Sequence, residues 1–157
     1  MSEVILCMLL NIATAGTDDL PTTPAAEHDK CGATALYALA RLSGVNATLV
    51  DVERLVPVGP KGASLADLRD SATALGIETE VLNCAYADDI HKLELPAILH
   101  TIRRSSEGHF VVLVSIKSDG YVAVIDGGSS LYYETPLGEL LRDWTGYALE
   151  RVLKLPE

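Results

Sequence analysis

The spacing of apolar residues changes at Gly76, and this change constrains the fold of the 157-residue chain more than any other feature. Before Gly76, apolar residues recur every three or four positions, as in helices that bury one face. After Gly76 they alternate or form short runs rich in Val, Ile and Leu, as in strands. Helices followed by strands predict an α+β domain in which N-terminal helices pack on an antiparallel sheet.

The first half is predicted to form helices over residues 31–43, 50–55 and 64–75. Gly44 is placed to end the first helix, and Asp29 is a candidate for its N-cap. Ser64 and Asp67 resemble a capping box that opens the third helix, with Asp in the place of the usual Glu. These residues set the expected ends of the helices.

The second half is predicted to form strands over residues 77–82, 96–102, 109–117, 121–125, 131–134 and 147–155. The tripeptide 118–120 (Ser-Asp-Gly) predicts a hairpin turn between the third and fourth of these strands. A weak helical turn is expected over residues 88–93. A helix is expected over residues 135–144, with Pro136 at its first position, where a missing N–H is harmless.

The charge balance excludes one class of partner and disfavours another. The net charge is −10, and the 12 Lys and Arg residues form no basic cluster. Nucleic-acid binding needs a basic surface that neutralises phosphates, so a nucleic-acid partner is excluded. The same shortage of basic residues disfavours binding to an anionic membrane surface.

The N-terminus differs in composition from the rest of the chain. An apolar run over residues 4–12 is followed by Ala-Thr-Ala, which resembles a cleavage site, although the usual positively charged start is missing. Residues 1–16 are therefore interpreted as a signal peptide, with a partly buried N-terminal segment as the alternative. The first interpretation predicts a periplasmic, extracellular or membrane-associated protein, and the second a cytoplasmic one. Residues 17–27 are interpreted as a lead-in or linker, and residues 28–157 as the domain.

No metal or cofactor is predicted. The four histidines are scattered, and neither Cys-x-x-Cys nor His-Glu-x-x-His occurs, so a zinc site is not expected. Two glycine-containing stretches, Gly59–Gly62 and Gly127–Gly128, lack the flanking residues of a phosphate-binding or dinucleotide-binding loop. Cys84 is expected to be a small buried residue, and His91 a surface residue.

Cys31 lies at the predicted N-terminus of the first helix, and two interpretations compete for it. A free cysteine is often a small core residue. At a helix N-terminus, however, unpaired backbone N–H groups carry partial positive charge, which favours a thiolate. Gly32 would let another group approach closely. A thiolate nucleophile also needs a histidine and a residue that orients the histidine.

His109 and Asp126 are predicted to supply those two groups. His109 begins one predicted strand, and Asp126 follows the end of the next. In a hairpin the start of one strand lies beside the end of the next, so the two side chains should meet. His100 also lies near a strand end and competes with His109, but the preceding glycine and the hairpin to Asp126 favour His109. Because Cys31, His109 and Asp126 occupy positions that fit together, nucleophilic catalysis is favoured over the interpretation of Cys31 as a core residue.

Seven stretches, in order along the chain, resemble one family of enzymes. They are Cys31–Leu36, Gly62–Leu68, Ala74–Gly76, Leu95–His100, Gly108–Leu113, Val124–Asp126 and Trp144–Gly146. They resemble the cysteine peptidase domain, family thirty-nine of the cysteine class, that removes double-glycine leader peptides from bacteriocins. The resemblance implies a papain-like fold and hydrolysis of peptide bonds.

The resemblance also implies roles for individual residues. Cys31 would be the nucleophile, His109 the general acid and base, and Asp126 the residue that orients the imidazole. The substrate would be a peptide or protein cut after small residues such as Gly. Because members of the family are commonly joined to exporting transporters, a transporter partner in trans is a further implication.

The chain departs from the family pattern at two positions. The family carries a Gln six residues before the nucleophile, whose amide helps form the oxyanion hole, but this chain has Ala25 there and no Gln anywhere. The backbone N–H of Cys31 and the side chain of His28 are candidate replacements. The family's Asp is often followed by Pro, whereas Gly127 follows it here. The alternative function is therefore a peptidase-like module that binds peptides or partner proteins without efficient cleavage.

Overall fold

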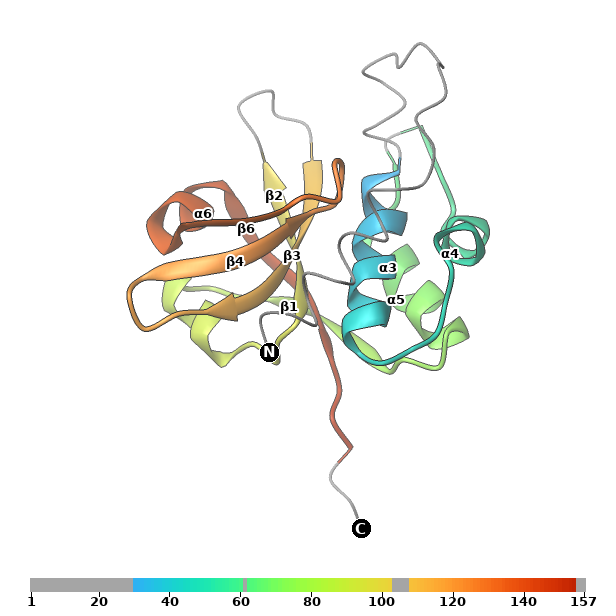
Figure 1. The fold of residues 1–157 in the computed structure, drawn as a ribbon, viewed down its shortest axis with the longest axis horizontal. Helices are drawn as coiled ribbons and strands as arrows, with labels where there is room; N and C mark the ends of the chain where they lie inside the picture. The colour runs from blue at the N-terminus through green and yellow to red at the C-terminus, as the bar shows by residue number, and fades with distance from the viewer. Residues whose placement is uncertain (1–29, 61, 103–107, 155–157) are drawn as a thin grey trace.

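The computed structural model describes residues 30–60, 62–102 and 108–154 of the chain (Figure 1). The predicted signal peptide (1–16) and lead-in (17–27) lie outside these residues, as does the side chain of His28. The division of the chain into these segments therefore stays a prediction.

Three helices lie together on one side of a sheet (Figure 1). They are α3 (Cys31–Leu42), α4 (Leu49–Leu55) and α5 (Leu65–Ala74). α3 packs on the sheet and also contacts both of the other helices. No helix in the described part of the chain is long and apolar enough to cross a lipid bilayer.

The described residues form a sheet of six antiparallel strands in the order β1-β6-β2-β3-β4-β5. The strands are β1 (Thr79–Asn83), β2 (Ala97–Ile102), β3 (Gly108–Ile116), β4 (Tyr121–Asp126), β5 (Tyr132–Pro136) and β6 (Trp144–Arg151). A short 3-10 helix, η1 (Ala87–Lys92), follows β1, and α6 (Leu137–Asp143) separates β5 from β6. The prediction of an α+β domain with an antiparallel sheet is confirmed.

Capping boxes begin two of the helices. The Ser64 hydroxyl accepts a hydrogen bond from the Asp67 N–H at 3.1 Å, and the Asp67 carboxylate accepts one from the Ser64 N–H at 2.8 Å. The capping box predicted for α5 is therefore confirmed. Thr48 and Asp51 form an equivalent box at the start of α4, which was not predicted from the sequence.

The two ends of α3 differ in how well they were predicted. Gly44 follows the helix with φ of 82°, a left-handed conformation that glycine adopts without strain, as expected. The prediction of Asp29 as the N-cap is wrong. The Thr34 N–H donates to the Lys30 carbonyl, so Lys30 is the N-cap, and it makes no side-chain capping hydrogen bond.

Several boundaries in the second half also differ from the prediction, and the starts of α6 and β6 show why. Pro136 is the N-cap of α6 instead of its first residue, because its backbone is extended and still pairs with Tyr121 of β4. β6 begins at Trp144, earlier than the predicted Tyr147, because Trp144 pairs with Thr101 of β2. Pairing within the sheet decides both boundaries.

β3 is buried on both of its faces. Phe110 and Val112 contact the cluster of apolar side chains that includes the helices. Val111 and Leu113 belong to a second cluster on the opposite face. This alternation fixes which face each residue of β3 occupies, because a shift of one position would exchange the two sets.

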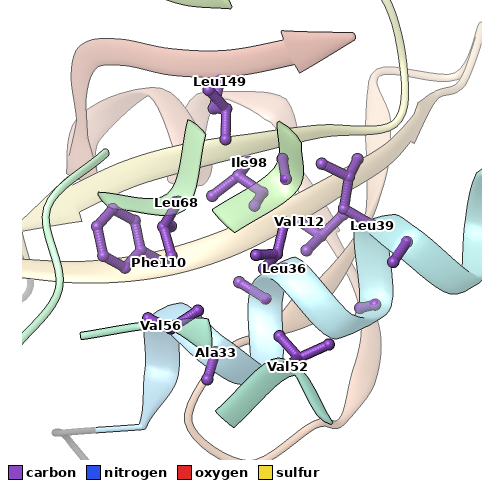
Figure 2. Close-up of a cluster of buried hydrophobic side chains, with 14 of the residues drawn as sticks. Ala33, Leu36, Leu39, Val52, Val56, Leu68, Ile98, Phe110, Val112 and Leu149 are labelled. Atoms are coloured by element: carbon purple, nitrogen blue, oxygen red, sulfur yellow. The ribbon is translucent and has the colours of Figure 1, made fainter. Parts of the chain in front are cut away.

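Leucines of α3 anchor the helix on the sheet. Figure 2 shows Leu36 and Leu39 facing Ile98 and Val112. All four side chains are completely buried. Since the axis of α3 is held by these contacts, the position of its first residue, Cys31, is held as well.

We expect Leu39→Ala to lower the free energy of unfolding by about 2–5 kcal/mol, because it removes a fully buried side chain and leaves a cavity. Leu153→Ala is the matched control, since Leu153 is 56% exposed and such a surface change stays within about 0.5 kcal/mol. Urea denaturation of both variants checks the expectation. Equal losses would contradict the assignment of Leu39 to the core.

Candidate active site

Cys31 is the first residue of α3 and carries a free thiol. The residue is only 6% exposed. The first turn of α3 holds no acidic side chain, and no side chain caps the helix within the described residues. The partial positive charge of the terminal N–H groups is thus left to act on whatever anion lies there.

The β3–β4 hairpin brings His109 and Asp126 together. Val111 pairs directly with Asp126, so His109, two residues earlier in β3, lies diagonally opposite Asp126 on the same face. His109 Nε2 is 3.0 Å from Asp126 Oδ1, and both residues are buried. With the Nε2 proton donated to the carboxylate, the ring is held in one orientation.

The Asp126 carboxylate is itself held by the turn that follows β4. Its Oδ1 accepts hydrogen bonds from the backbone N–H groups of Gly128 at 2.7 Å and Ser129 at 3.1 Å. Backbone donors of this kind leave the carboxylate little freedom to rotate. The orientation of the His109 ring therefore depends on the backbone of the turn as well as on the sheet.

The other ring nitrogen of His109, Nδ1, is buried and has no hydrogen-bond partner among the described residues. Burial by itself would lower the pKa of His109. The hydrogen bond with Asp126 and the interaction with the Cys31 thiol outweigh burial and raise this pKa to about 9. With Nε2 bonded to Asp126, Nδ1 is the ring nitrogen that remains for a second interaction.

The raised pKa means that His109 is charged at neutral pH. The usual value for histidine is 6.5, and the folded-state value of about 9 lies above it. The charged ring therefore contributes its full stabilisation below pH ~6.5, and this stabilisation is lost as the pH rises through about 9. A charged acid next to a thiol is thus available over the neutral range.

His100 lies near this pair but makes different contacts. Its Nδ1 is 3.0 Å from Thr145 Oγ1, and the Thr145 hydroxyl donates to the His100 carbonyl. Its ring meets Phe110 edge to face, with 5.5 Å between the ring centroids. Burial lowers the pKa of His100, and the charge of His109 lowers it further. The histidine that contacts Asp126 is His109.

Cys84 follows β1 and His91 lies in η1, whereas His28 falls outside the described residues. Cys84 is half-buried instead of buried, and it lines a cavity of about 440 Å³ at the end of β1. Burial raises the pKa of its thiol, and the charges of Asp89 and Glu150 raise it further. His91 is exposed, as expected. Within residues 30–60, 62–102 and 108–154, no group of three or more His, Cys, Asp or Glu side chains could hold a metal ion.

Two contacts around the site were not predicted from the sequence. The first is the bond between His100 and Thr145, for which the sequence holds no signal because 45 residues separate the two. The second is the contact that Gly127 makes with β3, where its N–H donates to the Phe110 carbonyl at 3.0 Å. The Gly-Gly pair after Asp126 could have indicated, from the sequence, that another backbone segment lies close to the chain here.

We expect Asp126→Asn to lower the pKa of His109 by about one unit or more, because the opposing charge is removed while burial remains. Asp88→Asn removes the same charge at an exposed position of η1 and is the control. Imidazole NMR titration of His109 in the three proteins checks this. An unchanged midpoint in Asp126→Asn would show that Asp126 does not set the charge of the ring.

Comparison with known proteins identifies relatives over most of the chain. The sequence profile of the Peptidase C39 family matches residues 19–153. The chain is 33% identical over 131 residues to the colicin V secretion/processing ATP-binding protein CvaB of Escherichia coli. It is 32% identical over 131 residues to an E. coli protein described as a probable microcin-H47 secretion/processing ATP-binding protein, MchF. Each match covers 83% of this chain but only 18% of the relative.

Solved structures support the same fold. A double-glycine motif protease from an AMS/PCAT transporter, in complex with its leader peptide, superposes with a TM-score of 0.70 at 24% identity, covering 88% of this chain and 94% of that one. The peptidase domain of Streptococcus ComA gives a TM-score of 0.70 at 20% identity, with 86% and 97% covered. The predicted papain-like peptidase fold and the predicted family resemblance are both confirmed. The chain belongs to the peptidase C39 family.

Proposed function

We propose that this domain is a cysteine peptidase in which Cys31 is the nucleophile, His109 the general acid and base, and Asp126 the orienting residue. The observation that carries the proposal is the buried His109–Asp126 hydrogen bond of 3.0 Å. It leaves Nδ1 as the free ring nitrogen, and the Cys31 thiol helps to raise the pKa of that ring. Nucleophile, base and orienting group in one chain of contacts are what thiol catalysis requires.

The proposed reaction has two stages. The Cys31 sulfur attacks the peptide carbonyl carbon and forms a C–S bond, and the charged His109 gives its Nδ1 proton to the leaving amine as the C–N bond breaks. Neutral His109 then takes a proton from water, which attacks the thioester. The C–S bond breaks, the product leaves as a carboxylic acid that gives its proton to the solvent, and the thiolate and charged imidazole are restored. The Cys31 backbone N–H, with His28 as a second candidate, would stabilise the oxyanion.

The proposed substrate is a leader-type peptide cut after small residues such as Gly. The relatives support it, since they are described as secretion and processing proteins and, for one solved structure, as a double-glycine motif protease in complex with the leader peptide. This chain matches 18% of the length of the E. coli relatives. Coupling of the domain to a transporter, and export of the domain or its association with a membrane, belong to the proposal.

A peptidase-like binding module is the second candidate. It is favoured by one observation: the chain has Ala25 six residues before Cys31 and contains no glutamine. Loss of one oxyanion donor lowers catalysis by about a hundred- to a thousandfold. The domain would then bind peptides or partner proteins and cut them slowly.

We expect Cys31 to react with iodoacetamide at a rate that stays level well below pH ~8.5, where an ordinary thiol loses its reactivity. Peptide mass mapping separates Cys31 from Cys84, whose raised pKa makes it the slow internal control at low pH. His109→Ala should remove the level region. A rate for Cys31 that rises only near pH ~8.5 in the wild-type protein would refute the peptidase proposal.

Restoring the missing amide provides a second test. We expect Ala25→Gln to raise the cleavage rate of a leader-type peptide ending in Gly-Gly by up to about a hundred- to a thousandfold. Ala26→Gln is the matched control, and Cys31→Ser should abolish cleavage in either background. If Ala25→Gln behaves like Ala26→Gln, the missing amide does not limit turnover. Peptide binding without cleavage in all the variants would favour the binding module.

A further inference from the structure

His100 of β2 lies where the pairing of β2 with β6 is irregular. The register of the two strands shifts at His100, which leaves residues 145–147 of β6 as a bulge opposite it. Gly146, in the middle of the bulge, has a φ of 91°. The bulge places the Thr145 hydroxyl at 3.0 Å from both the carbonyl and Nδ1 of His100. Bulges often aim a side chain beside an active site.

The contacts with Thr145 decide which ring nitrogen of His100 carries the proton. A hydroxyl has a single proton, and that of Thr145 is donated to the His100 carbonyl. Thr145 Oγ1 must therefore accept from the ring, so Nδ1 carries the proton. In a neutral imidazole with its proton on Nδ1, the other nitrogen, Nε2, has a lone pair and is a hydrogen-bond acceptor.

Nε2 of His100 is an acceptor without a partner among the described residues. It makes no hydrogen bond with them, and it is not one of the buried atoms that lack a partner, so it is open to a ligand. A Cβ on Gly108 would lie 2.6 Å from it, and the glycine thus leaves this nitrogen uncovered. Burial lowers the pKa of His100, and the charge of His109 lowers it further. The ring is therefore neutral at neutral pH and keeps its lone pair.

Phe110 connects His100 with the start of α3. The rings of His100 and Phe110 meet edge to face, with 5.5 Å between their centroids. A carbon of the Phe110 ring lies 3.6 Å from the place that a Cβ on Gly32, next to Cys31, would take. An extended peptide advances about 3.3 Å per residue, so these two distances together correspond to about two or three residues of a substrate. Nε2 is thus within reach of a peptide whose carbonyl carbon lies at the Cys31 thiol.

We propose that His100 is a substrate-binding residue whose Nε2 accepts a hydrogen bond from a backbone N–H of the peptide, about two or three residues from the bond that is cut. This role rests on the proposed peptidase function and deepens it. The acceptor selects a main-chain N–H whatever the side chain of that residue. It excludes proline from the contacted position, because proline has no N–H to donate.

The tautomer of His100 can be measured in the wild-type full chain without a substrate. We expect long-range ¹H–¹⁵N NMR spectra to show the proton on Nδ1, and Thr145→Val to move part of the population to the form with the proton on Nε2. His91, which is exposed in η1, is the internal control and should not change in Thr145→Val. A wild-type His100 with its proton on Nε2 would overturn the proposal, since that nitrogen would be a donor.

Two isosteric variants separate substrate binding from a structural role. In cleavage of a leader-type peptide ending in Gly-Gly, we expect His100→Asn to raise KM by about two- to tenfold, the effect of one neutral hydrogen bond, with kcat near the wild-type value. Asn has an amide near the position of Nδ1 but none at Nε2. His100→Gln places an amide oxygen near Nε2 and should restore KM. If Asn, which keeps the contact with Thr145, performs better than Gln, His100 is structural and the proposal fails.

N-methylated peptides identify the N–H that His100 contacts. Each N–H within three residues of the cut, except that of the cut bond itself, is replaced in turn by N–CH3, which gives sarcosine at the glycines. At one position we expect the methyl group to raise KM more in the wild-type protein than in His100→Asn, where the hydrogen bond is already absent. A methyl group that only obstructs binding would act equally on both proteins. Equal effects at every position would refute the contact.

Binding to Cys31→Ser distinguishes the failure of this role from the failure of the peptidase function. If the wild-type protein does not cleave the peptide, the same comparisons are made on Kd by fluorescence anisotropy. A Kd raised by His100→Asn and not by His100→Gln would keep this role in a binding module and remove the peptidase proposal. Wild-type cleavage that His100→Asn leaves unchanged would remove this role alone. Neither cleavage nor binding would remove both.

Discussion

The antiparallel register of β3 and β4 is the constraint on which the site depends. It places Val111 opposite Asp126 and so brings His109 within hydrogen-bond distance of the carboxylate. A slip of one residue would turn the two side chains to opposite faces of the sheet. The register is held because β3 is buried on both faces and because the turn over residues 118–120 joins the two strands closely.

Burial stabilises the fold but disfavours a charged histidine in the site. The Asp126 carboxylate offsets this cost. Leu36 and Leu39 hold α3 on the sheet by excluding water, and Cys31 belongs to the same apolar cluster. His109 is buried as well. A charged imidazole is unfavourable in such a region unless it is paired. Asp126 supplies the pairing charge, and its own orientation is set by backbone N–H groups of the following turn.

The features that could be predicted from the sequence depend on residues close together in the chain. The capping box of Ser64 and Asp67 and the hairpin turn are of this kind, and so is the meeting of His109 and Asp126. The boundaries that were wrong depend on distant partners. Trp144 joins β6 through its pairing with β2, and no local pattern in the sequence reports that pairing.

By itself, the sequence determined the order of helices and strands, the α+β class, and the choice of three residues for the site, because periodicity, capping and hairpin geometry are local. Only the tertiary structure decided how α3 meets the hairpin. That contact runs through the backbone of Gly127 against the Cys31 and Phe110 carbonyls. Its closeness depends on packing between segments almost a hundred residues apart, which no spacing of residue types along the chain can specify.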